Sequence, residues 1–324
     1  MANCSPNSSS KPLPVWLAAL GLCGLLTACS GGERENGVSS EAQRPAELAA
    51  FQADQQRWRE QRVAELTRSD GWTSLVGLHW IGPGAHHFGS DTDNGIRLAV
   101  GPEHLGRIEL NAGATRFVPE QGVAVTLDGA PLTGPAELHA DDAAGGPSVL
   151  GFDDGRGLAT VIKRGARHAL RVKHADAPGR VGFGGLDYWP ARQQWRVAGQ
   201  FVEHPPGRTL PIANIIGTIE QVPNPGAIEF ERDGTLHRIE ALDHGEDTLF
   251  LVFADRTSGH GSYGAGRYLD APRPDAQGRI TLDFNRAYNP PCAFTAFATC
   301  PLPPPENRLE LAIAAGEKTY ASPH

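Results

Sequence analysis

The pattern of apolar and polar positions changes once along the chain. From Glu47 to Thr67, apolar residues recur at helical spacing among many Glu, Gln and Arg residues. This spacing and this helix-forming composition predict one amphipathic helix. We place the helix within residues 47–70, because the sequence Ser69-Asp70-Gly71 is typical of a helix end.

After this helix, short runs rich in Val, Ile, Leu and aromatic residues alternate with Gly, Pro, Asn and Asp, which is typical of all-β chains. Asp128-Gly129 and Asp233-Gly234 each lie between two such runs, where a tight hairpin requires positive φ. No repeat of 20 to 50 residues occurs, which argues against a solenoid or a propeller. The predicted strands are 77–81, 95–99, 106–110, 123–127, 158–163, 168–173, 195–202, 215–221, 227–231, 236–241, 248–253, 267–269 and 279–284.

The segment 181–195 is rich in Gly, Pro and aromatic residues and separates two sets of strands. The sequence therefore predicts a mainly β protein in which the helix at 47–70 precedes two β domains. We expect the first β domain at 71–185. The second, at 186–324, is expected to be an antiparallel sandwich or barrel.

The beginning of the chain has the features of a secretory signal peptide over residues 1–28: a polar lead with Lys11, an apolar run from Val15, and then small residues. Its end, Leu26-Thr27-Ala28-Cys29, resembles the bacterial lipobox, which implies cleavage before Cys29 and acylation of its thiol. A lipid bilayer is then the expected partner of Cys29. Residues 29–46 are small, polar and charged, and are predicted to form a flexible tether.

The residue after Cys29, the net charge and the remaining cysteines each predict a property of the protein. Ser30, and not Asp, follows Cys29, which by resemblance to the Gram-negative sorting pattern implies the periplasmic face of the outer membrane. A formal net charge of −8 argues against nucleic acid as a partner. Cys292 and Cys300 are the cysteines that remain beyond Cys29, and we expect them to form a disulfide in an oxidising compartment.

Neither a metal nor another cofactor is expected. The alternative in which Cys292 and Cys300 bind a metal lacks further ligands, because no His lies between them. The pairs His86-His87 and His237 with His244 do not have the spacing that places two ligands on one helix face. The glycine-rich stretch 253–270 has no third glycine that opens a helix, so it does not predict a dinucleotide site.

Several blocks together resemble one family. These are the helix with Trp58 and Arg62, then GWTSLVGLHWIGPGAHHFGSD from residue 71, FADRTSGHGSYGAGRYLD from residue 253, DFNRAYNPPCAFTAFATCPLPPPENRL from residue 283, and IAAGEK from residue 313. They resemble the DUF1684 family over residues 58 to 318. Because this family is of unknown function, the resemblance implies a shared architecture and no activity.

The first β domain also resembles forkhead-associated (FHA) sandwiches, through the strand 78–81, a glycine turn, GSDTDNGIRLA and VTLDGAPL. FHA domains read phosphothreonine with an Arg after an early Gly and with a Ser and a His in the next loop. Here Ser90 follows Gly89, and His104 has no matching Ser. The resemblance therefore implies a sandwich without implying phosphopeptide binding.

Chemistry-bearing residues gather late in the chain. Arg267 and Arg286 are candidate anion clamps, and aromatic residues beside them offer a stacking surface. If 283–289 continues a strand, Asp283 and Asn285 face one side, and Arg286 and Tyr288 the other. The candidate ligand-binding residues are Arg267, Tyr268, Asp283, Asn285, Arg286, Tyr288 and Asn289.

The same residues admit three interpretations. The first is a site that binds a small molecule, glycan or peptide in the second β domain. The second is a structural network that orders an unusual loop through Asp283, Arg286 and Glu306. The third interpretation is an envelope hydrolase with Asp283 or Glu306 as acid or base and Arg267 and Arg286 as anion clamps. Ser258, Ser262, His260 and Asp255 lack the G-x-S-x-G elbow of a serine hydrolase.

Overall fold

The computed structural model of the protein describes residues 39–321. The predicted signal peptide and the predicted acylation site at Cys29 lie outside these residues. Within the described part, none of the helices combines the length and the apolarity that a membrane crossing requires. All strands of the described residues lie after residue 46, within the second of the two units into which the chain divides, residues 46–324.

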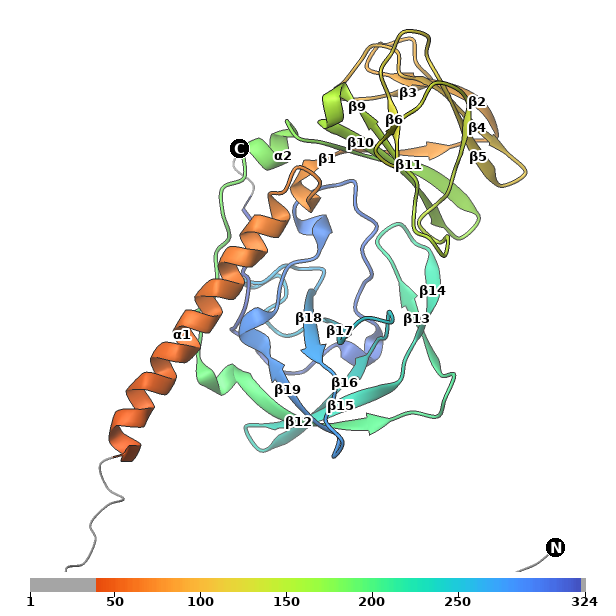
Figure 1. The fold of residues 1–324 in the computed structure, drawn as a ribbon. Coiled ribbons are helices and arrows are strands. Elements are labelled where there is room, and N and C mark those ends of the chain that lie inside the picture. Colours follow the sequence, from red (N-terminus) through yellow and green to blue (C-terminus); the bar gives the residue numbers. More distant parts are fainter. Residues whose placement is uncertain (1–38, 322–324) are drawn as a thin grey trace, which may run out of the picture. The chain divides into compact units, whose positions relative to one another are not determined.

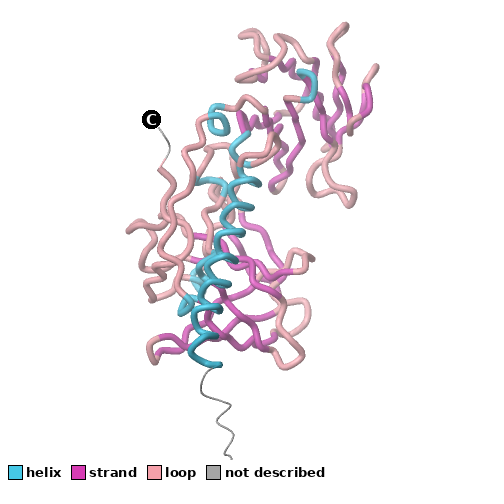
Figure 2. Tube along the Cα trace, turned by 60° about the vertical axis from the view of Figure 1, so that its left-hand side comes forward, coloured by secondary structure: helices cyan, strands magenta, loops and turns pink. Residues whose placement is uncertain are grey.

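The predicted helix is present as α1 (Ser39–Leu66), and it begins before residue 47. Part of the predicted tether, residues 39–46, is thus helical. Phe51 and Leu66 bury the apolar side of α1. The helix ends where the hydroxyl of Thr73 donates a hydrogen bond of 2.6 Å to the Leu66 carbonyl. Figures 1 and 2 show α1 beside loops of the C-terminal part of the chain.

The strands before residue 175 form two sheets. The six-stranded sheet has the order β1-β11-β10-β9-β6-β7, and the five-stranded sheet has the order β3-β2-β4-β5-β8. The strands are β1 (Leu75–Ile81), β2 (Gly84–Gly89), β3 (Ile96–Arg97), β4 (Gly106–Asn111), β5 (Ala114–Pro119), β6 (Thr126–Leu127), β7 (Ala130–Pro131), β8 (Ala136–Leu138), β9 (Val149–Phe152), β10 (Gly157–Arg164) and β11 (Arg167–His174).

These two sheets pack face to face. Val161 and Leu170 of the first sheet share a buried apolar cluster with Ile108 and Phe117 of the second. Side chains alternate along each strand, so every second residue contributes to this core. The first β region is therefore a sandwich.

The strands after residue 195 form three antiparallel sheets with the orders β16-β15-β12-β19, β13-β14 and β17-β18. They are β12 (Arg196–Glu203), β13 (Thr209–Ala213), β14 (Ile219–Pro223), β15 (Gly226–Arg232), β16 (Thr235–Ala241), β17 (Thr248–Phe253), β18 (Arg267–Pro272) and β19 (Arg279–Asp283). These described strands close no barrel. The expected mainly β, antiparallel fold is confirmed, whereas the boundary between residues 185 and 186 stays a prediction.

The remaining elements are single turns. They are α2 (Pro178–Val181) and the 3-10 helices η1 (Trp72–Ser74), η2 (Asp153–Gly155), η3 (Gln193–Trp195), η4 (Phe284–Arg286), η5 (Pro291–Ala293) and η6 (Pro305–Asn307). Helix η4 corrects one expectation, because the chain does not continue as a strand after Asp283. The Asp283 carboxylate accepts the backbone N–H of Asn285 and caps this turn instead.

Both predicted hairpin turns occur. Asp128-Gly129 joins β6 to β7, and Asp233-Gly234 joins β15 to β16. All four residues have φ between 51° and 81°. Glycine and aspartate adopt this left-handed region more easily than bulkier residues, which is why these dipeptides mark the turns.

The side chain of Arg267, at the start of β18, has no exposed surface. Its Nη2 donates to Asp255 Oδ2 at 2.7 Å and to the Ile313 carbonyl at 2.9 Å, and Nη1 donates to the Ala315 carbonyl. Asp255 also accepts the backbone N–H of Thr257 at 2.6 Å. One buried ion pair thus joins the glycine-rich loop to the C-terminal segment.

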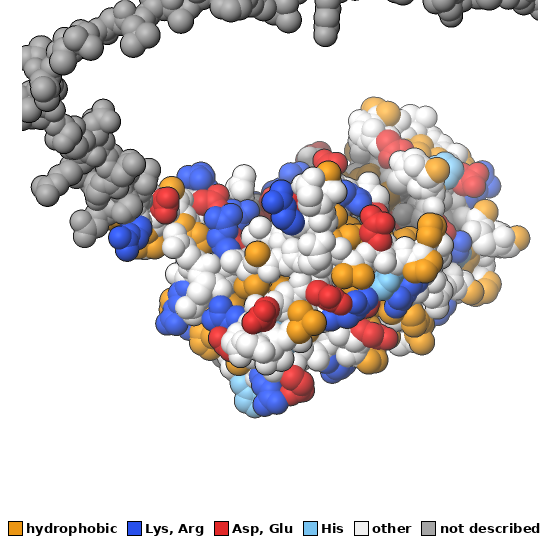
Figure 3. All heavy atoms as spheres, turned by 90° about the horizontal axis from the view of Figure 1, so that it is seen from below, with side chains coloured by type: hydrophobic (Ala, Val, Ile, Leu, Met, Phe, Trp, Pro, Cys, Tyr) orange, Lys and Arg blue, Asp and Glu red, His pale blue; other side chains and the backbone are white. Residues whose placement is uncertain are grey.

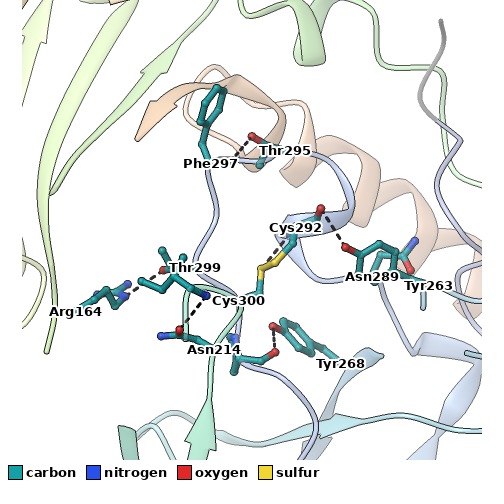
Figure 4. Close-up of a disulfide and its surroundings, with 12 residues drawn as sticks. Arg164, Asn214, Tyr263, Tyr268, Asn289, Cys292, Thr295, Phe297, Thr299 and Cys300 are labelled. Carbon is teal, nitrogen blue, oxygen red and sulfur yellow. Dashed lines mark hydrogen bonds between the residues drawn. A yellow bond between two sulfur atoms is a disulfide. The ribbon is translucent and has the colours of Figure 1, made fainter. Parts of the chain in front are cut away.

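Cys292 and Cys300 form the expected disulfide. The bridge closes the short loop 292–300, which begins within η5 (Figure 4). The hydroxyl of Tyr263 donates to the Cys292 carbonyl at 3.3 Å, and the carbonyl of Cys300 accepts the backbone N–H of Ile215 at 3.0 Å. The disulfide therefore fixes residues that also pair with the chain after β13.

Arg267→Met is expected to lower the free energy of unfolding by about 3–5 kcal/mol, because Asp255 would stay buried without its counter-charge. Arg256→Met is the matched control, since Arg256 lies on the same loop and pairs with the exposed Glu310. The control should lose at most about 1 kcal/mol. Urea unfolding of both variants measures the difference, and equal losses would contradict this role of Arg267.

Replacing both Cys292 and Cys300 by Ser is expected to lower the free energy of unfolding by about 2–3 kcal/mol, because the unfolded chain regains the freedom of the open loop. Urea unfolding of the wild type in a reducing agent should match that of the double variant, which itself should not respond to the agent. A wild type with two titratable thiols and no response to reduction would be inconsistent with the disulfide.

Candidate functional site

Most of the predicted ligand-binding residues form hydrogen bonds or ion pairs with other parts of the chain. Arg267 is enclosed, and the hydroxyl of the buried Tyr268 donates to the Pro301 carbonyl at 2.9 Å. Tyr268 and Tyr288 also exchange backbone hydrogen bonds. Burial raises the pKa of both phenols, which keeps them neutral.

Asp283 and Asn285 form a second internal group. The side chain of Asn285 has no exposed surface and bonds to both the N–H and the carbonyl of Arg192, at 2.9 and 3.0 Å. The Asp283 carboxylate accepts Nδ2 of Asn285 at 2.8 Å and Nε2 of Gln55 at 2.9 Å. Asn285 thus fixes the loop at residue 192, and Asp283 contacts helix α1 through Gln55.

Arg286, Tyr288 and Asn289 likewise contact helix α1. Arg286 pairs with Asp54, and Arg62 donates at 2.9 Å to the Asn289 carbonyl. The Arg62 guanidinium also lies 4.6 Å from the centre of the Tyr288 ring. The segment 283–289 therefore contacts helix α1, and ligand binding by these residues stays a prediction.

Arg62 makes one further contact that locks this arrangement. Its Nε donates at 2.9 Å to the carboxylate of Glu317, which also accepts the backbone N–H of Asn289 at 2.7 Å. Burial raises the pKa of Glu317, and the charge of Arg62 opposes that rise. Helix α1, the segment 283–289 and the C-terminal segment are thus joined at one buried carboxylate.

The glycine-rich loop does not assemble a nucleophilic triad. The Ser262 hydroxyl is buried and accepts hydrogen bonds from Thr257 Oγ1 at 2.8 Å and from Trp189 Nε1 at 3.1 Å. His260 is exposed, and its Nδ1 contacts the Ser258 carbonyl at 3.2 Å. No hydrogen bond joins a serine hydroxyl to a histidine among the residues of this loop.

At a different place, polar and apolar side chains surround an open space. It is a cavity of about 480 Å³, which we call the sheet cavity. One of its walls is the small sheet formed by β13 and β14. Residues 300–302 extend this sheet, because Leu302 N–H donates to the Ala213 carbonyl at 2.8 Å and the bridge pairs Asn214 with Pro301.

Every second side chain of these three strands lies on the face that lines the cavity. Side chains two residues apart lie on the same face of a sheet. The cavity is lined from this face by Ile212, Asn214, Glu220, Val222, Thr299 and Pro301. Three segments that are far apart in the sequence thus present one surface, and part of it comes from the block that follows Cys292.

The opposite wall comes from the sandwich. Arg164 ends β10 and donates from Nη1 to Asp141 Oδ2 at 2.8 Å, and its Nε donates to Thr299 Oγ1 at 3.1 Å (Figure 4). Lys163 donates from Nζ to Asp142 Oδ2 at 2.8 Å. Arg164 therefore joins the two walls, and each cation of this wall has a carboxylate beside it.

A second guanidinium lies behind the first. Nη2 of Arg171 is 3.5 Å from Thr299 Oγ1, and its buried Nε has no hydrogen-bond partner among the described residues. Burial and the neighbouring charge of Arg164 lower the pKa of Arg171 to about 10. The hydroxyl oxygen of Thr299 is therefore used as an acceptor, which leaves it unsuited to act as an activated nucleophile.

The third side of the cavity is more apolar. It is lined by Leu242, His244 and Phe250, and the rings of His244 and Phe250 lie 5.3 Å apart. Glu220 is exposed on the sheet wall and has no ion-pair partner among the described residues. The cavity thus offers an apolar surface beside one uncompensated carboxylate.

His244 and Phe250 also line a neighbouring cavity of about 250 Å³ together with Asp270 and Tyr288. The Tyr288 hydroxyl donates to Asp270 Oδ2 at 3.0 Å. Limited hydration raises the pKa of Asp270, and this hydrogen bond opposes the rise. Tyr288 is the predicted ligand-binding residue that lines this second cavity.

On the face drawn in Figure 3, acidic and basic side chains lie interspersed. Such mixing does not create the field of one sign that attracts a highly charged partner.

One group of side chains has the composition of a metal site. Ligand atoms of Asp91, Asp93 and His104 lie within 4.8 Å of one another. However, Asp91 Oδ1 already accepts the backbone N–H of Asp93 at 3.2 Å in a local turn, and Asp93 and His104 are exposed. Because turn formation accounts for the position of Asp91, we assign no metal to this group.

Comparison with known proteins finds similarity over part of the chain. Residues 181–318 match the family model described as a protein of unknown function, DUF1684. A solution NMR structure of an uncharacterized protein of Haloarcula marismortui is 34% identical over 43% of this chain and 79% of that chain, with a TM-score of 0.36. No curated protein matches the chain.

The match of the family model includes the buried Arg267 pair, the disulfide loop and the sheet wall of the cavity, which all lie between residues 181 and 318. Through this region, the chain belongs to the DUF1684 family.

Proposed function

We propose that this protein is a binding protein that takes a small molecule, glycan or peptide into the sheet cavity. The observation that carries this proposal is the joint lining by an apolar surface, an uncompensated carboxylate and the polar groups of Arg164 and Asn214. Ligand sites are commonly concave and mostly apolar, with a few polar groups that fix orientation. A volume of about 480 Å³ also lies in the range of such sites.

The alternative of an envelope hydrolase receives less support. Asp283 is engaged by Asn285 and Gln55, and Glu306 is exposed on η6. Neither residue lines the sheet cavity. A general acid or base must reach the reacting group of a bound substrate, so binding without catalysis is the simpler function for this geometry.

We further propose that the protein works in the cell envelope, held to the bilayer by an acylated Cys29. The lipobox-like sequence before Cys29 supports this location. A chain anchored by lipid needs no membrane-binding face on its folded part. The cavity would then be offered to ligands of the envelope.

Ligand binding is testable by a thermal-shift screen of the purified protein against envelope sugars, peptides and metabolites. At about 100 times its Kd, a ligand of the cavity should raise Tm by about 5–10 °C. Val222→Trp should abolish the shift because the larger ring enters the cavity. Ile219→Trp is the matched control, since Ile219 lies on the other face of the same strand and should leave the shift unchanged. Failure of every compound, or shifts that Val222→Trp leaves intact, would reject the cavity as the site.

Acylation is testable by mass spectrometry of the N-terminal peptide isolated from membranes. The wild type should yield a peptide that starts at Cys29 and carries fatty acid, and Cys29→Ser should yield no acylated peptide. Cys23→Ser is the control, because Cys23 belongs to the predicted signal peptide, and it should leave acylation unchanged. An unmodified Cys29, or a mature chain that starts elsewhere, would refute the anchor.

A further inference from the structure

Strand β14 forms one edge of the small sheet. Ala213 on β13 directs its carbonyl away from β14, because that oxygen accepts the N–H of Leu302. The neighbouring residue Ile212 must then direct its backbone groups toward its partner Glu220, since these directions alternate along a strand. It follows that Ile219 and Gln221, on either side of Glu220, direct their N–H and carbonyl groups away from the sheet.

These outward groups have no partner. Among the described residues, no backbone or side chain bonds to the N–H or carbonyl of Ile219 or Gln221, and β14 pairs with β13 alone. The edge is also open to water, because the side chains from Ile219 to Gln221 are exposed and Ile219 keeps 67% of its surface. Figure 1 shows β14 on the outer side of its hairpin.

One end of this edge is already in use. The N–H of Asp243 donates to the outward carbonyl of Pro223 at 2.9 Å. The chain then leaves the edge, and His244 lines the sheet cavity. A strand beside β14 would therefore extend the pairing that Asp243 begins at Pro223. It would meet the free N–H and carbonyl groups of Ile219 and Gln221 along the rest of the edge.

The sheet cavity lies on one face of this edge. Glu220 and Val222 of β14 line it, whereas Ile219 and Gln221 do not. A strand added to β14 would carry every second side chain on the same face as Glu220 and Val222, because alternation is in register across a sheet. Those side chains would lie over the cavity and its apolar residues Ile212, Leu242 and Phe250.

We infer that the ligand of the sheet cavity is an extended peptide segment that adds as a strand to β14 and places alternate side chains in the cavity. This inference rests on the proposed function, because it names the ligand class of the same site. Strand addition draws affinity from backbone hydrogen bonds and specificity from pockets for alternate side chains. Here Ile219 and Gln221 supply the backbone groups, and the cavity supplies the pocket.

The lining also sets the chemistry of the peptide. The apolar residues favour an aliphatic or aromatic side chain in the cavity. The uncompensated carboxylate of Glu220 favours a Lys or Arg side chain next to it on the same face. The preferred segment thus has an apolar and a basic residue two positions apart, and it lacks proline where its own N–H must reach β14.

A random peptide library displayed on phage and selected on the purified full chain tests this inference. Enriched sequences are synthesised, and their binding is measured by fluorescence polarisation. Gln221→Pro should weaken binding by about tenfold or more, because proline removes the outward N–H without breaking a bond to β13. Gln221→Ala is the matched comparison, because it removes the same side chain but keeps the N–H, and it should lose clearly less affinity than Gln221→Pro.

Three results would overturn the inference. They are the absence of enriched peptides, equal binding to the wild type and Gln221→Pro, and an equal loss for Gln221→Ala and Gln221→Pro. If Gln221→Pro binds normally while Val222→Trp does not, strand addition is wrong and the cavity remains the ligand site. If neither variant changes binding, the proposed function fails as well. Should Gln221→Pro unfold, Ile219→Pro removes the other outward N–H and must give the same loss.

Discussion

A guanidinium group without access to water constrains the whole C-terminal half of the chain. Arg267 cannot lose its charge, so its surroundings must supply a carboxylate and carbonyl groups in place of water. Asp255 supplies the carboxylate, and the carbonyls of Ile313 and Ala315 come from the end of the chain. The segment 313–317 must therefore lie against the glycine-rich loop before either surface is complete.

This requirement extends to helix α1. Glu317 follows the segment that surrounds Arg267, and its buried carboxylate receives both Arg62 of the helix and the backbone of Asn289. The polar residues from 283 to 289 are thus explained by the attachment of a helix that lies far away in the sequence. A cluster of Asp, Asn, Arg and Tyr has the same composition whether its partner is a ligand or another part of the chain.

The sequence was sufficient where the signal is local. The helix, the mainly β fold, the hairpins at Asp128-Gly129 and Asp233-Gly234, and the disulfide each depend on neighbouring residues or on a pair of cysteines. Strand β13 was missed because Pro211 argues against a strand. Its missing N–H lies on the side away from β14, so no hydrogen bond to β14 is lost.

The sheet cavity was missed for a different reason. Its residues come from β10, β13, β14 and the segment after Cys292, and single-sequence patterns do not state which of these segments lie together. Arg164 and Thr299 are unremarkable in their own contexts and become informative only through their hydrogen bond. The sequence Thr299-Cys300-Pro301, at the end of the disulfide loop, is the local signal that the chain offers here, and by itself it does not indicate a cavity.

The hydroxyl of Tyr268 has a consequence for how the small sheet can grow. This hydroxyl donates to the carbonyl of Pro301, and proline has no N–H. The outer edge of residues 300–302 therefore has no free donor or acceptor for another strand. The opposite edge at β14 keeps its donors and acceptors. The small sheet therefore ends at residues 300–302, on the side of the disulfide, and it can be extended only at β14. Any added strand is thus limited to one position.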